Sequence, residues 1–231
     1  FEASPACAVN TADQQSVGSG YRKNGLLFVR TGSKEQNVLQ RKGDQIKIDW
    51  GYFYLSTGET GSSQSVGSAM AMRKAFATGG KLDGRVAAAG NANIAVTRSL
   101  GRSVKAEGMV MAGFDDIYSI QYFKTNLRPY WNRRGDNSIE QQFALAARDY
   151  AALKKKCGEF DRELMESATR KGGRKYAELC ALAYRQAIAA HKLVEAPNGD
   201  LMLFSKENAS NGSIGTVDIT YPSAPLLLYY N

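Results

Sequence analysis

The fold is decided by residues 138–171, SIEQQFALAARDYAALKKKCGEFDRELMESATRK. Ser138 and Gln141 have the Ser-x-x-Gln spacing of a capping box, in which each side chain bonds the other residue's free backbone N–H at the start of a helix. Apolar residues then recur in steps of three and four, the period of one helix face. They are Ile139, Phe143, Ala146, Tyr150, Leu153, Cys157, Phe160, Leu164 and Ala168. This pattern predicts one long amphipathic helix.

A second helix is predicted over residues 174–194, because Gly172-Gly173 interrupts the first helix and YAELCALAYRQAIAAHKLV follows. This second helix is small and apolar nearly all round, so it must be covered on several sides, as in a helical bundle or toroid. In a hairpin of two such helices, the first helix alone cannot bury all of the apolar surface of the second. We therefore expect the chain to be part of a longer protein. Its first residues, FEASPACAVNTADQQ, have neither an initiator Met nor the features of a signal peptide, which favours the same expectation.

The part of the chain before residue 137 has the pattern of β-strands separated by Gly-, Ser- and Asn-rich turns. In residues 45–55, QIKIDWGYFYL, the side chains of Ile46, Ile48, Trp50, Tyr52 and Tyr54 alternate onto one face. Many short strands with this spacing favour an antiparallel sandwich, with one short helix at 69–80. Further strands are predicted within residues 25–30, 85–101, 103–114 and 116–123.

Charge and residue usage exclude several classes of function. The net charge is +8, and residues 1–137 carry 18 Lys and Arg against 11 Asp and Glu without an aromatic-interleaved basic stripe. We therefore expect no nucleic-acid partner. We also expect no membrane span, because no apolar run approaches about 20 residues. Three cysteines without a close pair and a single His191 disfavour zinc sites and most His-containing triads. We expect neither a metal nor another cofactor.

Candidate catalytic residues lie in residues 205–231, SKENASNGSIGTVDITYPSAPLLLYYN. Glu207 and Asp218 are two carboxylates in polar, Gly-containing loops, as general acid–base hydrolysis requires. Asn208, Asn211 and Tyr221 would position a substrate beside them. A purely structural role is the alternative for the two carboxylates, and Asn208 and Asn211 also fit glycosylation sequons or loop hydrogen bonding.

A second group of candidates lies in LRPYWNRRGDN, residues 127–137, at the junction of the strand-rich and helical parts. Arg128 and Trp131 combine a cation with an aromatic ring, which is typical of ligand clefts between domains. The alternative is a packed linker that Trp131 anchors.

Four blocks of the sequence resemble the glutaminase A-like family, which includes secreted fungal glutaminases and many uncharacterised proteins of gut Bacteroidetes. The likeness extends over residues 8–231, and its most specific part is KENASNG followed by TVDITYPSAP. Ala209 and His191 depart from residues that are common in relatives. The four blocks are TGSKEQNVLQRKGDQIKIDWGYFYL, FDDIYSIQYFKTNLRPYWNRRGDNSIEQQFALAARDY, GGRKYAELCALAYRQAIAAHKLV and SKENASNGSIGTVDITYPSAPLLLYYN.

The resemblance implies an N-terminal β-sandwich-like domain followed by segments that together build an α/α toroid. The expected fold is thus α+β: an antiparallel β-sandwich-like part, then a helical hairpin belonging to an incomplete α/α toroid. Residues 1–125 would be the C-terminal part of the β domain, and residues 126–231 the first part of the toroid. The partner of this chain would then be the missing C-terminal helical segment of the same protein, and the location secreted or periplasmic.

The resemblance also implies a function, a hydrolase acting on the side-chain amide of glutamine. By fold analogy the alternatives are a carbohydrate-active enzyme similar to glycoside hydrolases, or a non-catalytic sugar- or peptide-binding module. In each case the ligand is a small-molecule or sugar-like compound. The isolated chain is expected to be inactive, because half a toroid cannot enclose a substrate.

Overall fold

The computed structural model describes residues 1–40, 47–79, 82, 87–102, 105–206 and 212–230. The chain divides into two compact units. The β unit comprises Phe1–Lys42 and Ile46–Ala144, and the helical unit comprises Gly43–Gln45 and Leu145–Asn231. Antiparallel sheets, a long helix and a helical hairpin make the fold class α+β, as predicted.

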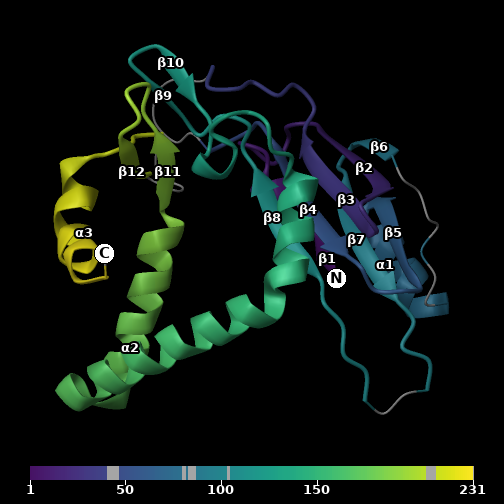
Figure 1. The fold of residues 1–231 in the computed structure, drawn as a ribbon. Helices are drawn as coiled ribbons and strands as arrows, with labels where there is room; N and C mark the ends of the chain where they lie inside the picture. The colour runs from purple at the N-terminus through teal and green to yellow at the C-terminus, as the bar shows by residue number, and fades with distance from the viewer. Residues whose placement is uncertain (41–46, 80–81, 83–86, 103–104, 207–211, 231) are drawn as a thin grey trace. The chain divides into compact units, whose positions relative to one another are not determined.

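The larger sheet of the β unit has five antiparallel strands in the order β6-β2-β3-β4-β8 (Figure 1). The predicted strand at 25–30 is confirmed and extends to Ser33. The alternating run 45–55 enters the sheet only from Tyr52, and the predicted strand at 103–114 only from Met111. The strand bounds are Ser16–Lys23 (β2), Leu26–Ser33 (β3), Tyr52–Thr57 (β4), Ala87–Gly90 (β6) and Met111–Asp115 (β8).

The smaller sheet has three antiparallel strands in the order β1-β7-β5: Glu2–Ala3 (β1), Asn93–Arg98 (β7) and Ser62–Gly67 (β5). The run 85–101, predicted as one strand, is divided into β6 and β7, which join different sheets. Apolar side chains from both sheets form the core between them, as the predicted sandwich requires. These are Leu27, Val29, Leu55, Val66, Ala92, Ile94 and Val96.

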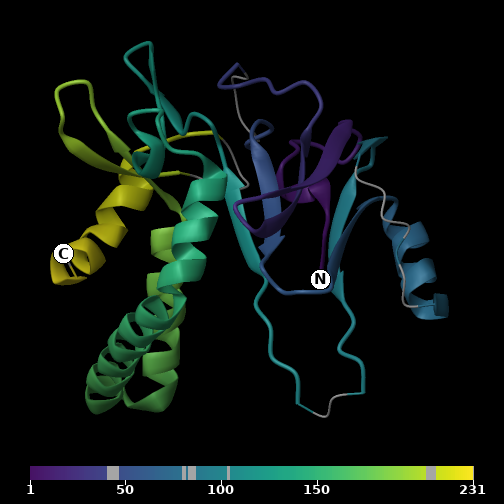
Figure 2. The same cartoon turned by 45° about the vertical axis from the view of Figure 1, so that its right-hand side comes forward.

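Short elements complete the β unit. The predicted helix is confirmed as α1 (Ala69–Gly79), which Figure 2 shows at the margin of the unit. Arg73 of α1 forms an ion pair with Glu2 (Nε–Oε2 2.8 Å). A hairpin of two short strands follows β8. The remaining elements are Pro5–Cys7 (η1), Ile120–Tyr122 (β9), Thr125–Leu127 (β10) and Tyr130–Asn132 (η2).

The long helix α2 (Ile139–Ala189) begins at the predicted capping box. The Ser138 N–H donates to Gln141 Oε1 (2.6 Å), and the Gln141 N–H donates to Ser138 Oγ (3.3 Å). The helix is interrupted at Gly173, whose φ of 82° and ψ of 175° are not helical. A β-carbon disfavours this backbone conformation, so glycine is the residue that allows the hairpin. Phe160 and Tyr184, on either side of the interruption, have ring centroids 4.9 Å apart.

The end of the second helix differs from the prediction. The helix was predicted to reach residue 194 but ends at Ala189, and β11 (His191–Glu195) pairs antiparallel with β12 (Leu201–Ser205). Each strand in this pair satisfies the backbone groups of the other, a non-local effect that helical periodicity does not reveal. A final helix, α3 (Val217–Tyr230), follows and contains Pro222 and Pro225.

Candidate functional site

The segment that carries the predicted carboxylate Glu207 is closed at its base by backbone pairing. Lys206 and Ile214 form an isolated antiparallel bridge, and the Gly215 N–H donates to the Ser205 carbonyl (2.8 Å). Glu207, Asn208 and Asn211 themselves lie outside the described residues. Ile214 and Gly215 are therefore held beside the end of β12.

Asp218 lies in the first turn of α3 and not in a loop, which corrects the prediction for this carboxylate. Tyr221 is three residues further along the same helix, so the two side chains lie on neighbouring positions of one face. The Tyr221 side chain is 79% exposed. Ser205 Oγ and Thr220 Oγ1 lie 3.0 Å apart and join β12 to α3. This contact was not predicted, because two hydroxyl residues 15 positions apart carry no local pattern.

Arg128 and Trp131 belong to the β unit, whereas Asp218 and Tyr221 belong to the helical unit. The Arg128 guanidinium lies 4.7 Å from the centroid of the Tyr118 ring, and its Nη2 donates to the Tyr118 hydroxyl (3.4 Å). Trp131 is half-buried within η2, and its carbonyl accepts a bond from Asn137 Nδ2 (3.2 Å). Stacking on Tyr118 orients the guanidinium, which leaves Arg128 able to offer further N–H donors.

A polar cluster that sequence analysis missed covers the outer face of the five-stranded sheet. Arg30 of β3 stacks over the Tyr52 ring (4.3 Å to the centroid), and its Nη1 and Nε donate to the Tyr54 hydroxyl (3.3 Å) and Ser19 Oγ (3.1 Å). The Tyr21 hydroxyl donates to Glu140 Oε1 (2.7 Å) in the first turn of α2. Cross-strand pairing brings these residues together, because Arg30 lies opposite both Ser19 and Tyr54.

The electrostatics of this cluster favour a structural role. Burial, and then the hydrogen bond to Glu140, raise the pKa of Tyr21 well above its usual range. Burial by itself would raise the pKa of Glu140, but the Tyr21 hydrogen bond, two further hydrogen bonds and the charge of Lys23 lower it overall. Burial also raises the pKa of Asp115 at the end of β8. A charged Glu140 and a protonated Tyr21 hold the first turn of α2 on the sheet.

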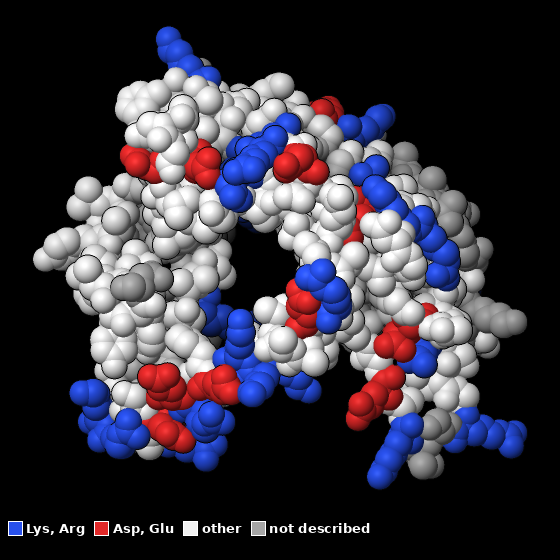
Figure 3. Space-filling model, in the orientation of Figure 1, with Lys and Arg blue, Asp and Glu red and all other residues white. Residues whose placement is uncertain are grey.

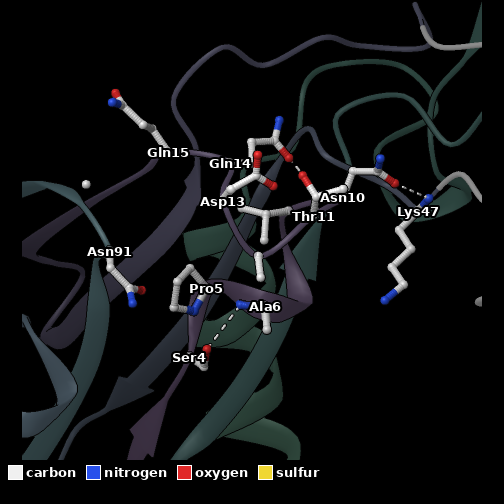
Figure 4. Close-up of a pocket in the computed structure, with 13 residues that line it drawn as sticks. Ser4, Pro5, Ala6, Asn10, Thr11, Asp13, Gln14, Gln15, Lys47 and Asn91 are labelled. Atoms are coloured by element: carbon white, nitrogen blue, oxygen red, sulfur yellow. Dashed lines mark hydrogen bonds between the residues drawn. The ribbon is translucent and has the colours of Figure 1, made fainter.

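The β unit also contains a polar pocket of about 490 Å³, which Figure 4 shows in close-up. Within it, Asn10 Oδ1 accepts from the Lys47 N–H (2.8 Å), and the Asn10 N–H donates to Gln14 Oε1 (2.7 Å). Gln14 Nε2 in turn donates to the buried Asp49 (3.0 Å). The pocket is lined by Ser4, Pro5, Ala6, Val9, Asn10, Thr11, Ala12, Asp13, Gln14, Gln15, Lys47, Gly90 and Asn91.

This pocket has the size of a small-molecule site, and its rim offers amides, one carboxylate and one ammonium group. The side-chain amide of Gln14 is already hydrogen-bonded within the protein through both its oxygen and its nitrogen. Lys47, Asn91 and Asn10 also line the pocket, as does Asp13, whose carboxylate accepts a hydrogen bond from the Thr11 side chain. No local sequence pattern marks these residues, because they come from a loop, a segment before β4 and a turn after β6.

Neither a metal-ligand cluster nor a membrane-spanning helix is found in the described part of the chain. No group of three or more His, Cys, Asp or Glu side chains there is arranged to hold a metal ion. Within the same residues, no helix combines the length and apolar character that crossing a bilayer requires. Basic and acidic side chains are interspersed on the face shown in Figure 3. On α2, Lys155 forms an ion pair with Glu159 (3.9 Å), and Arg174 forms one with Glu178 (3.0 Å).

Comparison with known proteins identifies both parts of the chain. Residues 1–167 match the family model described as a domain of unknown function (DUF5127), and residues 173–231 match the Glutaminase A six helical-hairpin domain. The chain is 27% identical over 224 residues to Glutaminase A of Aspergillus oryzae, covering 92% of this chain and 32% of that protein. It thus spans about a third of the length of this curated relative. No solved structure matches the chain. The two domain matches and the similarity along nearly the whole chain show that this protein belongs to the glutaminase A-like family.

Proposed function

We propose that the chain forms part of a hydrolase that cleaves the side-chain amide of glutamine. The observation that carries this proposal is the similarity to Glutaminase A along 92% of the chain, together with the match of residues 173–231 to the helical-hairpin domain of that protein. We further propose that the hairpin is one part of an α/α toroid, completed by helices of the same polypeptide. The domain boundary between residues 125 and 126 and a secreted or periplasmic location are parts of the same proposal.

Hydrolysis of an amide requires a base that removes a proton from water and an acid that protonates the departing nitrogen. Water then adds to the side-chain carbonyl, the C–N bond breaks, and glutamate and ammonia are released. We assign these two roles to Glu207 and Asp218. The pairing of Lys206 with Ile214 supports this assignment, because it fixes both ends of the Glu207 segment, and Asp218 follows four residues later at the start of α3.

Five further residues are proposed to bind the substrate. Asn208, Asn211 and Tyr221 would hydrogen-bond the amide and orient it toward the carboxylates. Arg128 would pair with the substrate α-carboxylate, since guanidinium and carboxylate form strong charge-assisted hydrogen bonds. Trp131 would supply an apolar wall.

The test uses protein extended to the length of the relative, assayed for ammonia release from glutamine. Glu207→Gln and Asp218→Asn should each lower kcat/KM by about a hundredfold or more, because each removes one proton-transfer group. Asp200→Asn, in the exposed β11–β12 turn, is the matched control and should leave kcat/KM unchanged. Full activity in both carboxylate variants would refute the assignment. Turnover of oligosaccharides without turnover of glutamine would establish the glycoside-hydrolase alternative.

The polar pocket of the β unit favours a second function, the non-catalytic binding of a small sugar- or peptide-like ligand. Its amides suit hydroxyl and peptide groups, and Asp13 with Lys47 would suit the two charges of a peptide. Titration calorimetry of the chain with disaccharides and dipeptides should detect binding that Asn91→Leu weakens at least about fivefold, the cost of one lost hydrogen bond. Lys124→Met, in the β9–β10 turn, is the control. Heat changes that are the same in Asn91→Leu and the unaltered chain would exclude this pocket as the site.

A further inference from the structure

The helical unit contains a cavity of about 210 Å³ between α2 and α3. Three of its six lining side chains are aromatic, and one is a carboxylate. Its floor is closed by Leu164, which is only 5% exposed. The lining residues are Phe160, Glu163, Leu164 and Ser167 of α2, and Tyr229 and Tyr230 of α3.

The aromatic rings form walls that stand at steep angles to one another. The rings of Tyr229 and Tyr230 are 4.8 Å apart between centroids with an interplanar angle of 82°, and the Phe160 and Tyr230 rings are 5.4 Å apart at 58°. Tyr184 packs against these rings, since its ring centroid lies 4.9 Å from that of Phe160 and 5.1 Å from that of Tyr230. Three rings of this cluster, those of Phe160, Tyr229 and Tyr230, line the cavity at steep angles to one another, so a ligand there would contact aromatic surface in more than one plane.

Glu163 is the charged residue of the cavity. It forms no ion pair with a residue that the structure describes, and its helical neighbours at positions 159, 160, 166 and 167 are Glu, Phe, Glu and Ser. No cation therefore lies one helical turn from Glu163 on its own face, and the cations of that face, Lys156 and Arg170, are two turns away. Burial, followed by nearby groups that include Glu163, raises the pKa of Tyr230, so its hydroxyl remains neutral. The cavity thus combines neutral aromatic walls with one negative charge.

We propose that this cavity binds an organic ammonium cation, one whose nitrogen carries alkyl groups. The ring faces attract a cation through their quadrupoles, and alkylated ammonium ions are recognised by such aromatic walls in proteins. Glu163 adds a full opposite charge, whereas an anion would meet both the carboxylate and the negative ring faces. The site differs from the proposed hydrolytic site, since Tyr230 lies roughly 18 Å along α3 from Asp218 at 1.5 Å per residue.

The test compares choline with its neutral isostere 3,3-dimethylbutan-1-ol, each titrated into protein extended to the length of the relative and followed by ¹H NMR of the ligand. Choline should bind at least about fivefold more tightly, because the isostere retains the shape and loses the charge. Glu163→Gln should remove most of this preference. Tyr229→Leu should weaken choline binding about two- to fivefold, the size of one exposed cation–π contact, and at 69% exposure its loss leaves no buried void.

Glu166→Gln is the matched control, an exposed carboxylate one helical turn away that does not line the cavity. It should leave both affinities unchanged, and circular dichroism should show the same helix content in every variant. Equal affinities for choline and the isostere would overturn the proposal. The same conclusion would follow if Glu163→Gln and Glu166→Gln behaved alike, or if choline failed to bind.

Discussion

Gly51→Ala should destabilise the β unit by more than about 4 kcal/mol, the range reached by the most damaging single substitutions. Gly51 has a φ of 77° and lies where β4 begins, against the end of β8. A β-carbon on this residue would overlap the Asp115 carbonyl oxygen and lie 2.9 Å from Asp116 Cα. Asp115 is the last residue of β8, so its backbone cannot move aside without breaking its pairing with Tyr52.

Gln36 prevents the Gly51 backbone from relaxing. The Gly51 N–H donates to Gln36 Oε1 (2.7 Å), and Gln36 Nε2 donates to the Gly51 carbonyl (3.1 Å). Gly61→Ala is the matched control, because Gly61 has nearly the same φ of 78° and no atom within 4 Å of the added carbon. It should cost only about 1–2 kcal/mol, the intrinsic cost of this backbone conformation for a residue with a side chain.

Urea unfolding followed by tryptophan fluorescence measures both changes. Trp50 and Trp131 are the two tryptophans of the chain, and both lie in the β unit. Trp50 is buried, and its Nε1 donates to the Asp116 and Tyr118 carbonyls (2.7 and 2.9 Å), next to the proposed clash. Equal losses of stability in Gly51→Ala and Gly61→Ala would show that the overlap with β8 is relieved in solution.

Phe28→Ala should cost about 3–5 kcal/mol of unfolding free energy, the range for removing a fully buried ring. Phe28 is 0% exposed and lies on the outer face of β3. Its ring stacks on Tyr21 at 5.4 Å and meets the edge of Phe143 at 5.6 Å. The substitution would leave a cavity between the sheet and the first turns of α2, so it should weaken the attachment of that helix as well as the sheet.

The control for Phe28→Ala is Phe123→Ala in the β9–β10 turn. Phe123 is 85% exposed, so the same change of side chain should alter stability by less than about 0.5 kcal/mol. The urea midpoint measures the stability of each variant. The slope of the unfolding free energy against urea concentration reveals any change in the surface exposed on unfolding. A similar midpoint for Phe28→Ala and Phe123→Ala would mean that the contact between β3 and α2 contributes little.

Local features of the fold were predictable because their causes lie within a few residues. The start of α2 follows from the hydrogen bonds between Ser138 and Gln141, and the hairpin follows from the backbone freedom at Gly173. Alternation predicted the strands of the sandwich but not which face of β4 enters its core. Leu55 packs there with Val29, whereas Tyr54, from the face that the alternating pattern marked, packs with Phe28 and Phe143. The predicted strand ends were less accurate, because β4 begins where it pairs with β8 and not where its alternating pattern begins.

The candidate sites were less predictable, because their members come together only through folding. The cluster around Arg30 depends on cross-strand register with Ser19 and Tyr54, and the ammonium cavity depends on α3 placing Tyr229 and Tyr230 beside Phe160. Neither arrangement produces a periodic pattern in the sequence.

Local sequence patterns specify the order of a strand-rich and a helical part, the start of the long helix and its interruption, because propensity, capping and hydrophobic period act within a few residues. The end of α2 at Ala189 and the position of Asp218 on a helix depend instead on contacts made in the folded chain. Pairing between His191–Glu195 and Leu201–Ser205 offers backbone hydrogen bonds that compete with one more turn of helix. That competition depends on residues about ten positions away, and it is settled only when the strands meet.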